Sequence, residues 1–104
     1  MIHDFIALQR NSACGDEITC SGIITNNTLS AINFDGKGCV ISQASASLLS
    51  EKAQNSSIKD ILSFDTNTLI ALLGISLGPV RMQCALLPLI ALQNGVEEYV
   101  ERKK

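Results

Sequence analysis

The chain has 104 residues, of which 46% are hydrophobic and 17% are charged, and its formal net charge is −2 at pH 7. This length predicts one domain over residues 1–104, and the absence of a basic run argues against nucleic acid as a partner. Because residues 69–92 are interrupted by glycine, proline and polar side chains, and the N-terminus lacks the features of a secretory signal, we expect a cytoplasmic protein without a membrane span.

The first third of the chain predicts a short helix followed by a hairpin. Apolar residues within 2–10 stand at helical spacing, so this segment is interpreted as a helix. Residues 16–24 and 28–34 are predicted to be antiparallel strands. Asn26 and Asn27 lie between them, and asparagine tolerates the positive φ of a tight turn.

The remainder of the chain predicts helices. Four segments are expected, at residues 40–53, 58–62, 67–73 and 80–94, and Pro79 suits the first turn of the last one. Pro88 is expected to bend the last helix or to remove a hydrogen bond near Cys84. Gly95 is expected to end or kink this helix, and residues 96–104 to be a charged helical segment.

A glycine-rich stretch, Gly36-Lys37-Gly38-Cys39, links the second strand to the first long helix. Glycine on both sides of Lys37 suggests a turn with unusual φ values or a close backbone approach. Cys39 then stands at or near a helix N-terminus, where the helix dipole favours a thiolate, as a metal ligand or sulfur nucleophile requires. The alternative is a structural cysteine buried after a glycine turn.

The hairpin brings separated metal-ligand side chains together. It places the start of the first strand beside the end of the second, so Cys14, Asp16 and Cys39 are expected at one edge of the sheet. Cys84 lies near the start of the last helix and would complete a four-ligand site if that end of the helix packs toward this edge. Zinc and iron–sulfur clusters both accept such ligands, although the spacing alone does not prove that Cys84 converges.

Four other polar or sulfur-containing side chains have less specific settings. Arg81 precedes Cys84 by one turn and would stabilise a thiolate or an anionic cluster. Lys37 is either a solvated turn charge or a screen for the charge of the ligands. Cys20 lies in the middle of a strand and is interpreted as a core cysteine, and His3 as a surface residue.

Three motifs in this order resemble the U-type iron–sulfur cluster assembly proteins: IscU, SufU and the N-terminal domain of NifU. The motifs are Cys14-Gly15-Asp16, Gly36-Lys37-Gly38-Cys39 with the following Ala-Ser-Ala-Ser run, and Pro79-Val80-Arg81-Met82-Gln83-Cys84. The resemblance implies an α+β fold, in which a small antiparallel sheet of two or three strands is covered on one face by several helices, including a long C-terminal helix.

The resemblance also implies roles for individual residues. Cys14, Cys39 and Cys84 match the three cysteines that hold zinc or a nascent [2Fe–2S] cluster, and Asp16 matches the aspartate beside them. Cys84 corresponds to the sulfur acceptor of the IscU branch and Cys14 to that of the SufU branch. The implied partners are a cysteine desulfurase, which delivers sulfur, and apo iron–sulfur proteins, which receive clusters.

The chain departs from the family pattern at several positions. Gln83 replaces the histidine of the IscU branch, and the Arg81 context is closer to SufU, whereas Ala13 replaces the usual proline. The N-terminal and middle segments are short, and we expect the apolar surface they leave uncovered to favour self-association. Three functions fit: a non-enzymatic scaffold for [2Fe–2S] assembly, a zinc-dependent sulfurtransferase that stimulates the desulfurase, and a non-catalytic zinc-stabilised module.

Overall fold

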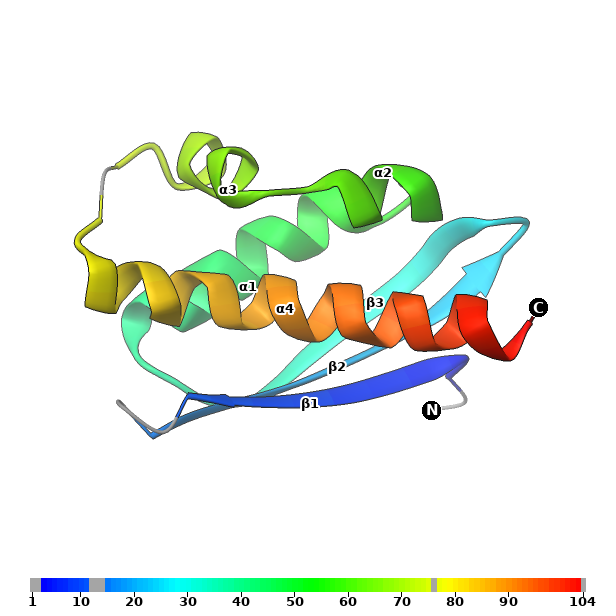
Figure 1. The fold of residues 1–104 in the computed structure, drawn as a ribbon, viewed down its shortest axis with the longest axis horizontal. Coiled ribbons are helices and arrows are strands. Elements are labelled where there is room, and N and C mark those ends of the chain that lie inside the picture. The colour runs from blue at the N-terminus through cyan, green and yellow to red at the C-terminus, as the bar shows by residue number, and fades with distance from the viewer. Residues whose placement is uncertain (1–2, 12–14, 76, 104) are drawn as a thin grey trace.

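A computed structural model describes residues 3–11, 15–75 and 77–103, in which three strands form one antiparallel sheet and four helices lie on one side of it (Figure 1). This confirms the α+β class. The strands lie side by side in the order β1-β2-β3. In chain order the elements are β1 (Phe5–Asn11), β2 (Asp16–Thr25), β3 (Thr28–Lys37), α1 (Val40–Ala53), α2 (Ile58–Ser63), α3 (Thr66–Leu73) and α4 (Pro79–Arg102).

The helix predicted at residues 2–10 is wrong, because the described part of this segment contains strand β1. Its residues pair antiparallel with β2, from Phe5 opposite Gly22 to Asn11 opposite Asp16. Phe5 faces the core. Ile6 and Leu8 point to the opposite side of the sheet, where they are 54% and 48% exposed. Apolar residues therefore occupy both faces of the strand, and this hid the alternation that would have predicted it.

The predicted hairpin of β2 and β3 is confirmed. Asn26 and Asn27 have φ values of 53° and 62°, which suit a two-residue turn between antiparallel strands. At the other end of the hairpin, Gly36 has a φ of 140° and lies opposite Ile18. A Cβ atom there would overlap the carbonyl oxygen of Glu17, so only glycine fits where β3 leaves the sheet.

Helices α1 to α3 begin and end close to the predicted residues. The Ser57 side chain accepts a hydrogen bond from the Asp60 amide and caps α2. Asp65 and Thr68 form a reciprocal capping box at the start of α3. Gly74, with a φ of 71°, ends α3 in the left-handed conformation.

Helix α4 is continuous from Pro79 to Arg102, so the predicted end or kink at Gly95 is wrong. Gly95 instead gives β1 room to approach the helix. A Cβ atom on Gly95 would lie 2.5 Å from Cδ2 of Phe5. Pro88 lies inside the helix and has no N–H to donate to the carbonyl of Cys84, one turn earlier.

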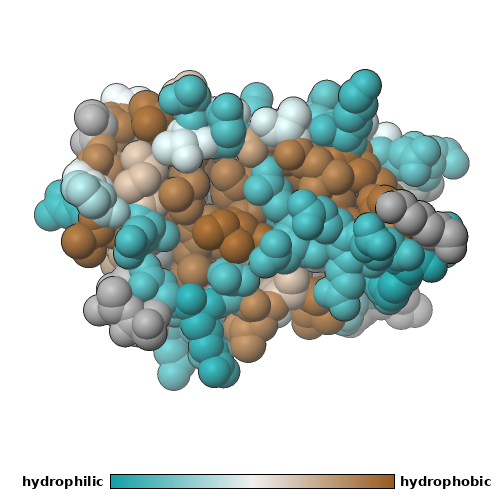
Figure 2. All heavy atoms as spheres, viewed as in Figure 1, coloured by the Kyte–Doolittle hydropathy of each residue, from teal (hydrophilic) through white to brown (hydrophobic). Residues whose placement is uncertain are grey.

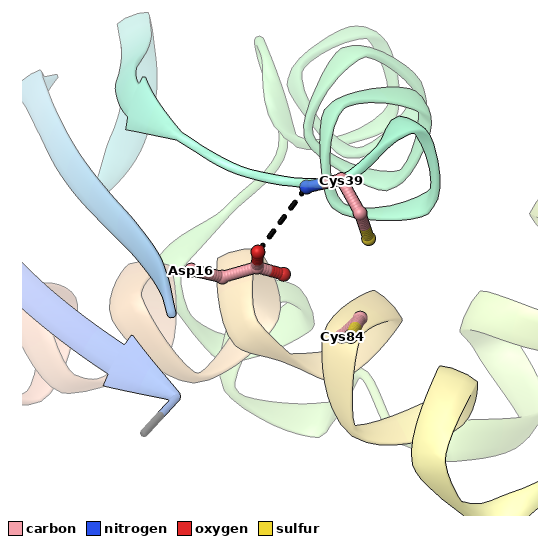
Figure 3. Close-up of side chains that lie close together, drawn as sticks. All are labelled: Asp16, Cys39 and Cys84. Carbon is pink, nitrogen blue, oxygen red and sulfur yellow. Dashed lines mark hydrogen bonds between the residues drawn. The ribbon is translucent and has the colours of Figure 1, made fainter. Parts of the chain in front are cut away.

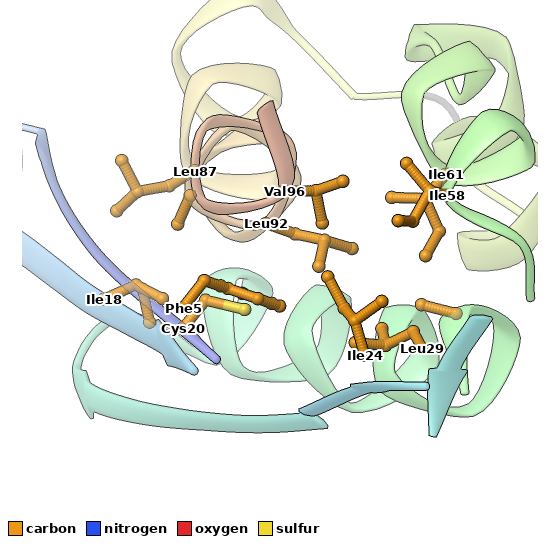
Figure 4. Packing of buried hydrophobic residues seen from close by; sticks show 12 residues of the cluster. Phe5, Ile18, Cys20, Ile24, Leu29, Ile58, Ile61, Leu87, Leu92 and Val96 are labelled. Carbon is orange, nitrogen blue, oxygen red and sulfur yellow. The ribbon is translucent and has the colours of Figure 1, made fainter. Parts of the chain in front are cut away.

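Aliphatic residues from the sheet and from α2 and α4 form the main core (Figure 4). Ile24 and Leu29 of the hairpin face Leu92 and Val96 of α4, and Ile61 of α2 closes the cluster from the other side. A smaller cluster joins α1, α3 and α4 through buried residues Leu49, Leu69, Ala85 and Leu89. Together these clusters fix the position of the N-terminal half of α4 against α1.

Polar and apolar surfaces are divided along α4. Hydrophilic atoms cover its C-terminal end, whereas apolar atoms gather toward its N-terminal half (Figure 2). In this half of the helix, Val80 and Ile90 have exposed fractions of 66% and 38%. Within the described ranges, none of the helices has both the length and the hydropathy that crossing a bilayer requires.

Candidate metal centre

The backbone at the junction of β3 and α1 places Cys39 at the edge of the sheet. Cys39 is the N-cap residue of α1, with extended backbone angles, and it is exposed to solvent. Its backbone N–H donates a hydrogen bond of 3.2 Å to Oδ1 of Asp16. This bond fixes the start of α1 directly to the first residue of β2.

Asp16 is buried, with only 5% of its surface exposed. The pairing of Glu17 with Lys37 sets the start of β2 beside the end of β3, as the hairpin predicts. Besides the Cys39 amide, the carboxylate accepts a hydrogen bond of 2.7 Å at Oδ2 from the Ser42 hydroxyl. A buried carboxylate held by two donors has a defined orientation.

Cys84 reaches the same corner from α4. It lies in the second turn of this helix, and it is 5% exposed. Its Sγ, the Cys39 Sγ and a carboxylate oxygen of Asp16 all lie within 4.8 Å of one another. Figure 3 shows the three side chains pointing toward one another from β2, from the start of α1 and from α4.

The chemistry and spacing of these three groups suit a tetrahedral metal ion. Zinc binds thiolate sulfur at about 2.3 Å and carboxylate oxygen at about 2.0–2.2 Å, which places tetrahedral ligand atoms about 3.5–3.8 Å apart. The observed limit of 4.8 Å therefore needs only a small contraction. Two thiols and one carboxylate leave one tetrahedral position for a further ligand.

The surroundings of Cys39 favour its thiolate. Desolvation acts to raise its pKa, but the N–H and hydroxyl of Ser42, the Ile41 amide and the Cys84 thiol lower it through hydrogen bonds. The net result is a Cys39 pKa below its ordinary value. A lowered thiol pKa at a helix N-terminus suits a metal ligand or a sulfur nucleophile.

Cys20 has the opposite character. Its side chain lies in the main core, and it is fully buried there, as the sequence analysis expected. Burial raises the pKa of its thiol to about 12. Cys20 is therefore an inert core residue, and it is not part of the candidate metal centre.

The other predicted side chains are exposed or lie outside the described residues. His3, Lys37 and Arg81 are exposed, and for His3 this is the expected position. Cys14 lies outside the described residues, so its role as a ligand and sulfur acceptor remains a prediction. The modulating roles of Lys37 and Arg81 also remain predictions.

Sequence reasoning missed the contribution of Ser42. It is completely buried, and its hydroxyl contacts both Asp16 and the backbone of Cys84. Its place three residues after Cys39, hence on the same side of the helix, was the available signal. The Ala-Ser composition of α1 hid this signal, because small residues there only suggested close helix packing.

The fold and the convergence of Asp16, Cys39 and Cys84 together define a class of protein. It is a small α+β protein with a group of side chains at a sheet edge that could bind a metal ion. The family model described as "NifU-like N terminal domain" matches residues 3–104, and the chain belongs to this family. The resemblance inferred from the three sequence motifs is thereby confirmed.

Curated relatives include both named branches of the family. The chain is 30% identical to the zinc-dependent sulfurtransferase SufU of Bacillus subtilis, in an alignment that covers 92% of this chain and 78% of the relative. It is 43% identical to the iron–sulfur cluster assembly scaffold protein IscU of Thermotoga maritima, but over only 52% of this chain and 38% of that protein.

Solved structures share the fold. A NifU-like N-terminal protein from Brucella abortus superposes with a TM-score of 0.80 at 16% identity, covering 98% of this chain and 83% of that one. A SUF-system scaffold protein from Fervidobacterium islandicum superposes with a TM-score of 0.75 at 24% identity, covering 90% and 81%. At these identities the likeness concerns the fold alone.

Proposed function

We propose that this protein is an iron–sulfur cluster assembly scaffold, which receives sulfur from a cysteine desulfurase and assembles and transfers a [2Fe–2S] cluster. The observation that carries the proposal is the convergence of Asp16, Cys39 and Cys84 at one corner of a fold of this family. The iron–sulfur cluster is the cargo of such a protein, so the site formed by these residues must bind this cluster and also release it.

Cys14 is proposed as the fourth ligand. It precedes Asp16 by two residues, so chain connectivity keeps their Cα atoms within about 7 Å of each other. A thiol from Cys14 would complete the tetrahedral set begun by Asp16, Cys39 and Cys84. Zinc bound there would stabilise the thiolate forms of the cysteines at neutral pH.

The sulfur-transfer step needs one free thiolate on this chain. That thiolate attacks the outer sulfur of the persulfide on the desulfurase, forming a new S–S bond while the desulfurase cysteine leaves as a thiolate. Two electrons are then required to convert each transferred sulfur into sulfide, and a thiol reductant supplies them in the assay below. Cys14 and Cys84 are the candidate acceptors, and the burial of Cys84 favours Cys14 in this conformation.

Reconstitution under anaerobic conditions tests the scaffold proposal. The full chain is incubated with ferrous iron, cysteine, dithiothreitol and a cysteine desulfurase, and the cluster is followed by visible absorption and circular dichroism. We expect a [2Fe–2S] spectrum that Cys39→Ser abolishes, whereas Cys20→Ser retains it. Failure of the parent chain to form a cluster would contradict the proposal. Transfer is then measured by adding an apo ferredoxin.

A zinc-dependent sulfurtransferase is the second candidate function. The observation in its favour is the 30% identity to the Bacillus subtilis protein that carries this name. Under this alternative the zinc-loaded chain accelerates desulfurase turnover, and mass spectrometry detects an added sulfur on Cys14 or Cys84. Zinc that stabilises the fold without either effect would instead indicate the third possibility, a non-catalytic module.

A further inference from the structure

We propose that Ser42 is a positioning residue that joins Asp16 to the backbone of Cys84 and thereby holds both in ligating geometry. This inference deepens the proposed function and rests on metal binding at the same corner. It assigns a role to a residue that carries neither a thiol nor a carboxylate.

The Ser42 hydroxyl lies beside the candidate metal centre. Its Oγ is 2.7 Å from Oδ2 of Asp16, 3.0 Å from the carbonyl oxygen of Cys84 and 3.7 Å from Sγ of Cys39. The side chain is completely buried. One hydroxyl on α1 therefore contacts each of the three candidate ligand residues that the structure describes, and these come from three different elements.

A serine hydroxyl has a single proton, and its two nearest acceptors here are Oδ2 of Asp16 and the carbonyl oxygen of Cys84. The Asp16 carboxylate is closer and carries charge when ionised, so it takes the stronger hydrogen bond. The Cys84 carbonyl receives the weaker part of the same interaction. If Asp16 moves toward or away from a metal ion, its hydrogen bond with Ser42 changes in strength. The hydrogen bond from the same hydroxyl to the Cys84 carbonyl then changes as well.

Pro88 removes the donor that a regular helix would offer to the carbonyl of Cys84. In a regular helix the N–H of residue 88 would donate to the carbonyl of residue 84, but proline has no N–H. The Ser42 hydroxyl donates to this carbonyl from the neighbouring helix. One turn further along α1, Ser45 donates to the carbonyl of Ala85 at 2.6 Å.

Gly38 leaves the space that this arrangement needs. A Cβ atom on Gly38 would lie 2.9 Å from Cβ of Ser42 and 3.8 Å from Cγ of Asp16. A side chain there would push Ser42 away from the carboxylate. Gly38 therefore leaves room for the Ser42 side chain beside Asp16, in addition to its place in the turn.

Ser45 provides a matched control. Like Ser42, it is a completely buried serine of α1 that donates to a carbonyl of α4. The hydrogen bonds described for Ser45 do not include Asp16 or Cys39. Loss of a buried hydroxyl should therefore destabilise both variants, whereas only Ser42→Ala removes a contact with ligand side chains.

The experiment measures Zn²⁺ affinity by competition with a chromophoric chelator for the full parent chain, Ser42→Ala, Ser42→Thr and Ser45→Ala. The absorption spectrum of the Co²⁺-loaded chains reports ligand geometry independently of any activity. Thermal unfolding of the metal-free chains, followed by circular dichroism, reports the structural cost of each substitution.

We expect Ser42→Ala to bind Zn²⁺ roughly 10-fold more weakly and to alter the Co²⁺ spectrum, because partners that orient metal ligands typically contribute this much. Ser45→Ala should keep the parent affinity and spectrum despite a similar loss of thermal stability. Ser42→Thr, which keeps the hydroxyl, should retain most of the affinity, and it provides the comparison if Ser42→Ala does not fold.

Three results would overturn the inference, and they differ in what else they affect. If Ser42→Ala matches Ser45→Ala in affinity and spectrum, or if Ser42→Thr loses affinity while folded, Ser42 is only a packing residue and the metal centre stands. If the parent chain itself does not bind Zn²⁺ or Co²⁺, the metal centre and this inference both fail.

Discussion

Substitution of Gly95 by alanine tests how strand β1 docks on helix α4. In an ordinary helix interior this change is stabilising by about 1 kcal/mol, because alanine has the higher helix propensity. Gly95 is buried, however, and a Cβ atom there would lie 2.5 Å from Cδ2 and 2.9 Å from Cε2 of Phe5. The structure therefore predicts the opposite sign.

The expected magnitude follows from these contacts. Carbon atoms pack at about 3.5–4.0 Å, so the Phe5 ring or α4 must shift by about 1 Å. The ring cannot simply move toward β2, because it also lies against Gly22, where a Cβ atom would be 2.8 Å away. Overpacking of this kind costs about 1–3 kcal/mol. Subtracting the propensity gain of about 1 kcal/mol leaves an expected net destabilisation of about 0–2 kcal/mol for Gly95→Ala.

Urea unfolding of the metal-free protein, followed by far-ultraviolet circular dichroism, measures this change; the chain has no tryptophan to serve as a fluorescent probe. Glu97→Ala, an exposed change two residues along α4, is the control and should stay within about 0.5 kcal/mol of the parent. Phe5→Leu in the Gly95→Ala background should recover part of the loss. A Gly95→Ala variant more stable than the parent by about 1 kcal/mol, as helix propensity alone predicts, would refute the docking of β1 described above.

Three further predictions concern single residues. The pKa of Cys20 is raised to about 12 from an ordinary 9.0. As the pH rises, the Cys20 thiol therefore loses its proton at a lower pH in the unfolded state than in the folded state. Stability should therefore fall as the pH rises from 9 toward 12, by up to about 1.4 kcal/mol per pH unit, and equilibrium unfolding of Cys20→Ala should lack this contribution. Near neutral pH, iodoacetamide should label Cys39 well before Cys20 in the metal-free native protein; equal rates by peptide mass spectrometry would contradict the described burial and thiol pKa values. Gly36→Ala should cost roughly 3 kcal/mol or more in urea unfolding, whereas Gly74→Ala, with open space around it, should cost about 1 kcal/mol, and equal costs would be inconsistent with the overlap at Gly36.

Local sequence signals predicted the hairpin and the helix termini well. The turn at Asn26 and Asn27 and the stop at Gly74 depend on the positive φ that these residues tolerate, and this is a property of single residues. The caps at Ser57 and Asp65 likewise depend on side chains three residues from their partners. Such features need no knowledge of the rest of the fold.

Features that depend on distant segments were missed or misinterpreted. The strand at β1 forms because β2 offers a pairing edge and Gly95, about ninety residues away, leaves room for Phe5. At the candidate metal centre, the nearness of Asp16 and Cys39 follows from the hairpin, whereas the approach of Cys84 depends on packing between α1 and α4. The role proposed for Ser42 depends on the same packing.

The order of synthesis has a consequence for when this corner becomes complete. Asp16 and Cys39 belong to a hairpin and its adjoining helix, whereas Cys84 lies in α4, which leaves the ribosome later. An unfinished chain would therefore hold incoming metal only weakly, and firm capture would wait until α4 has docked. Residues 1–78 alone should accordingly retain far less Zn²⁺ in equilibrium dialysis than residues 1–104. Loading would thus be restricted to molecules in which α4 has already been made.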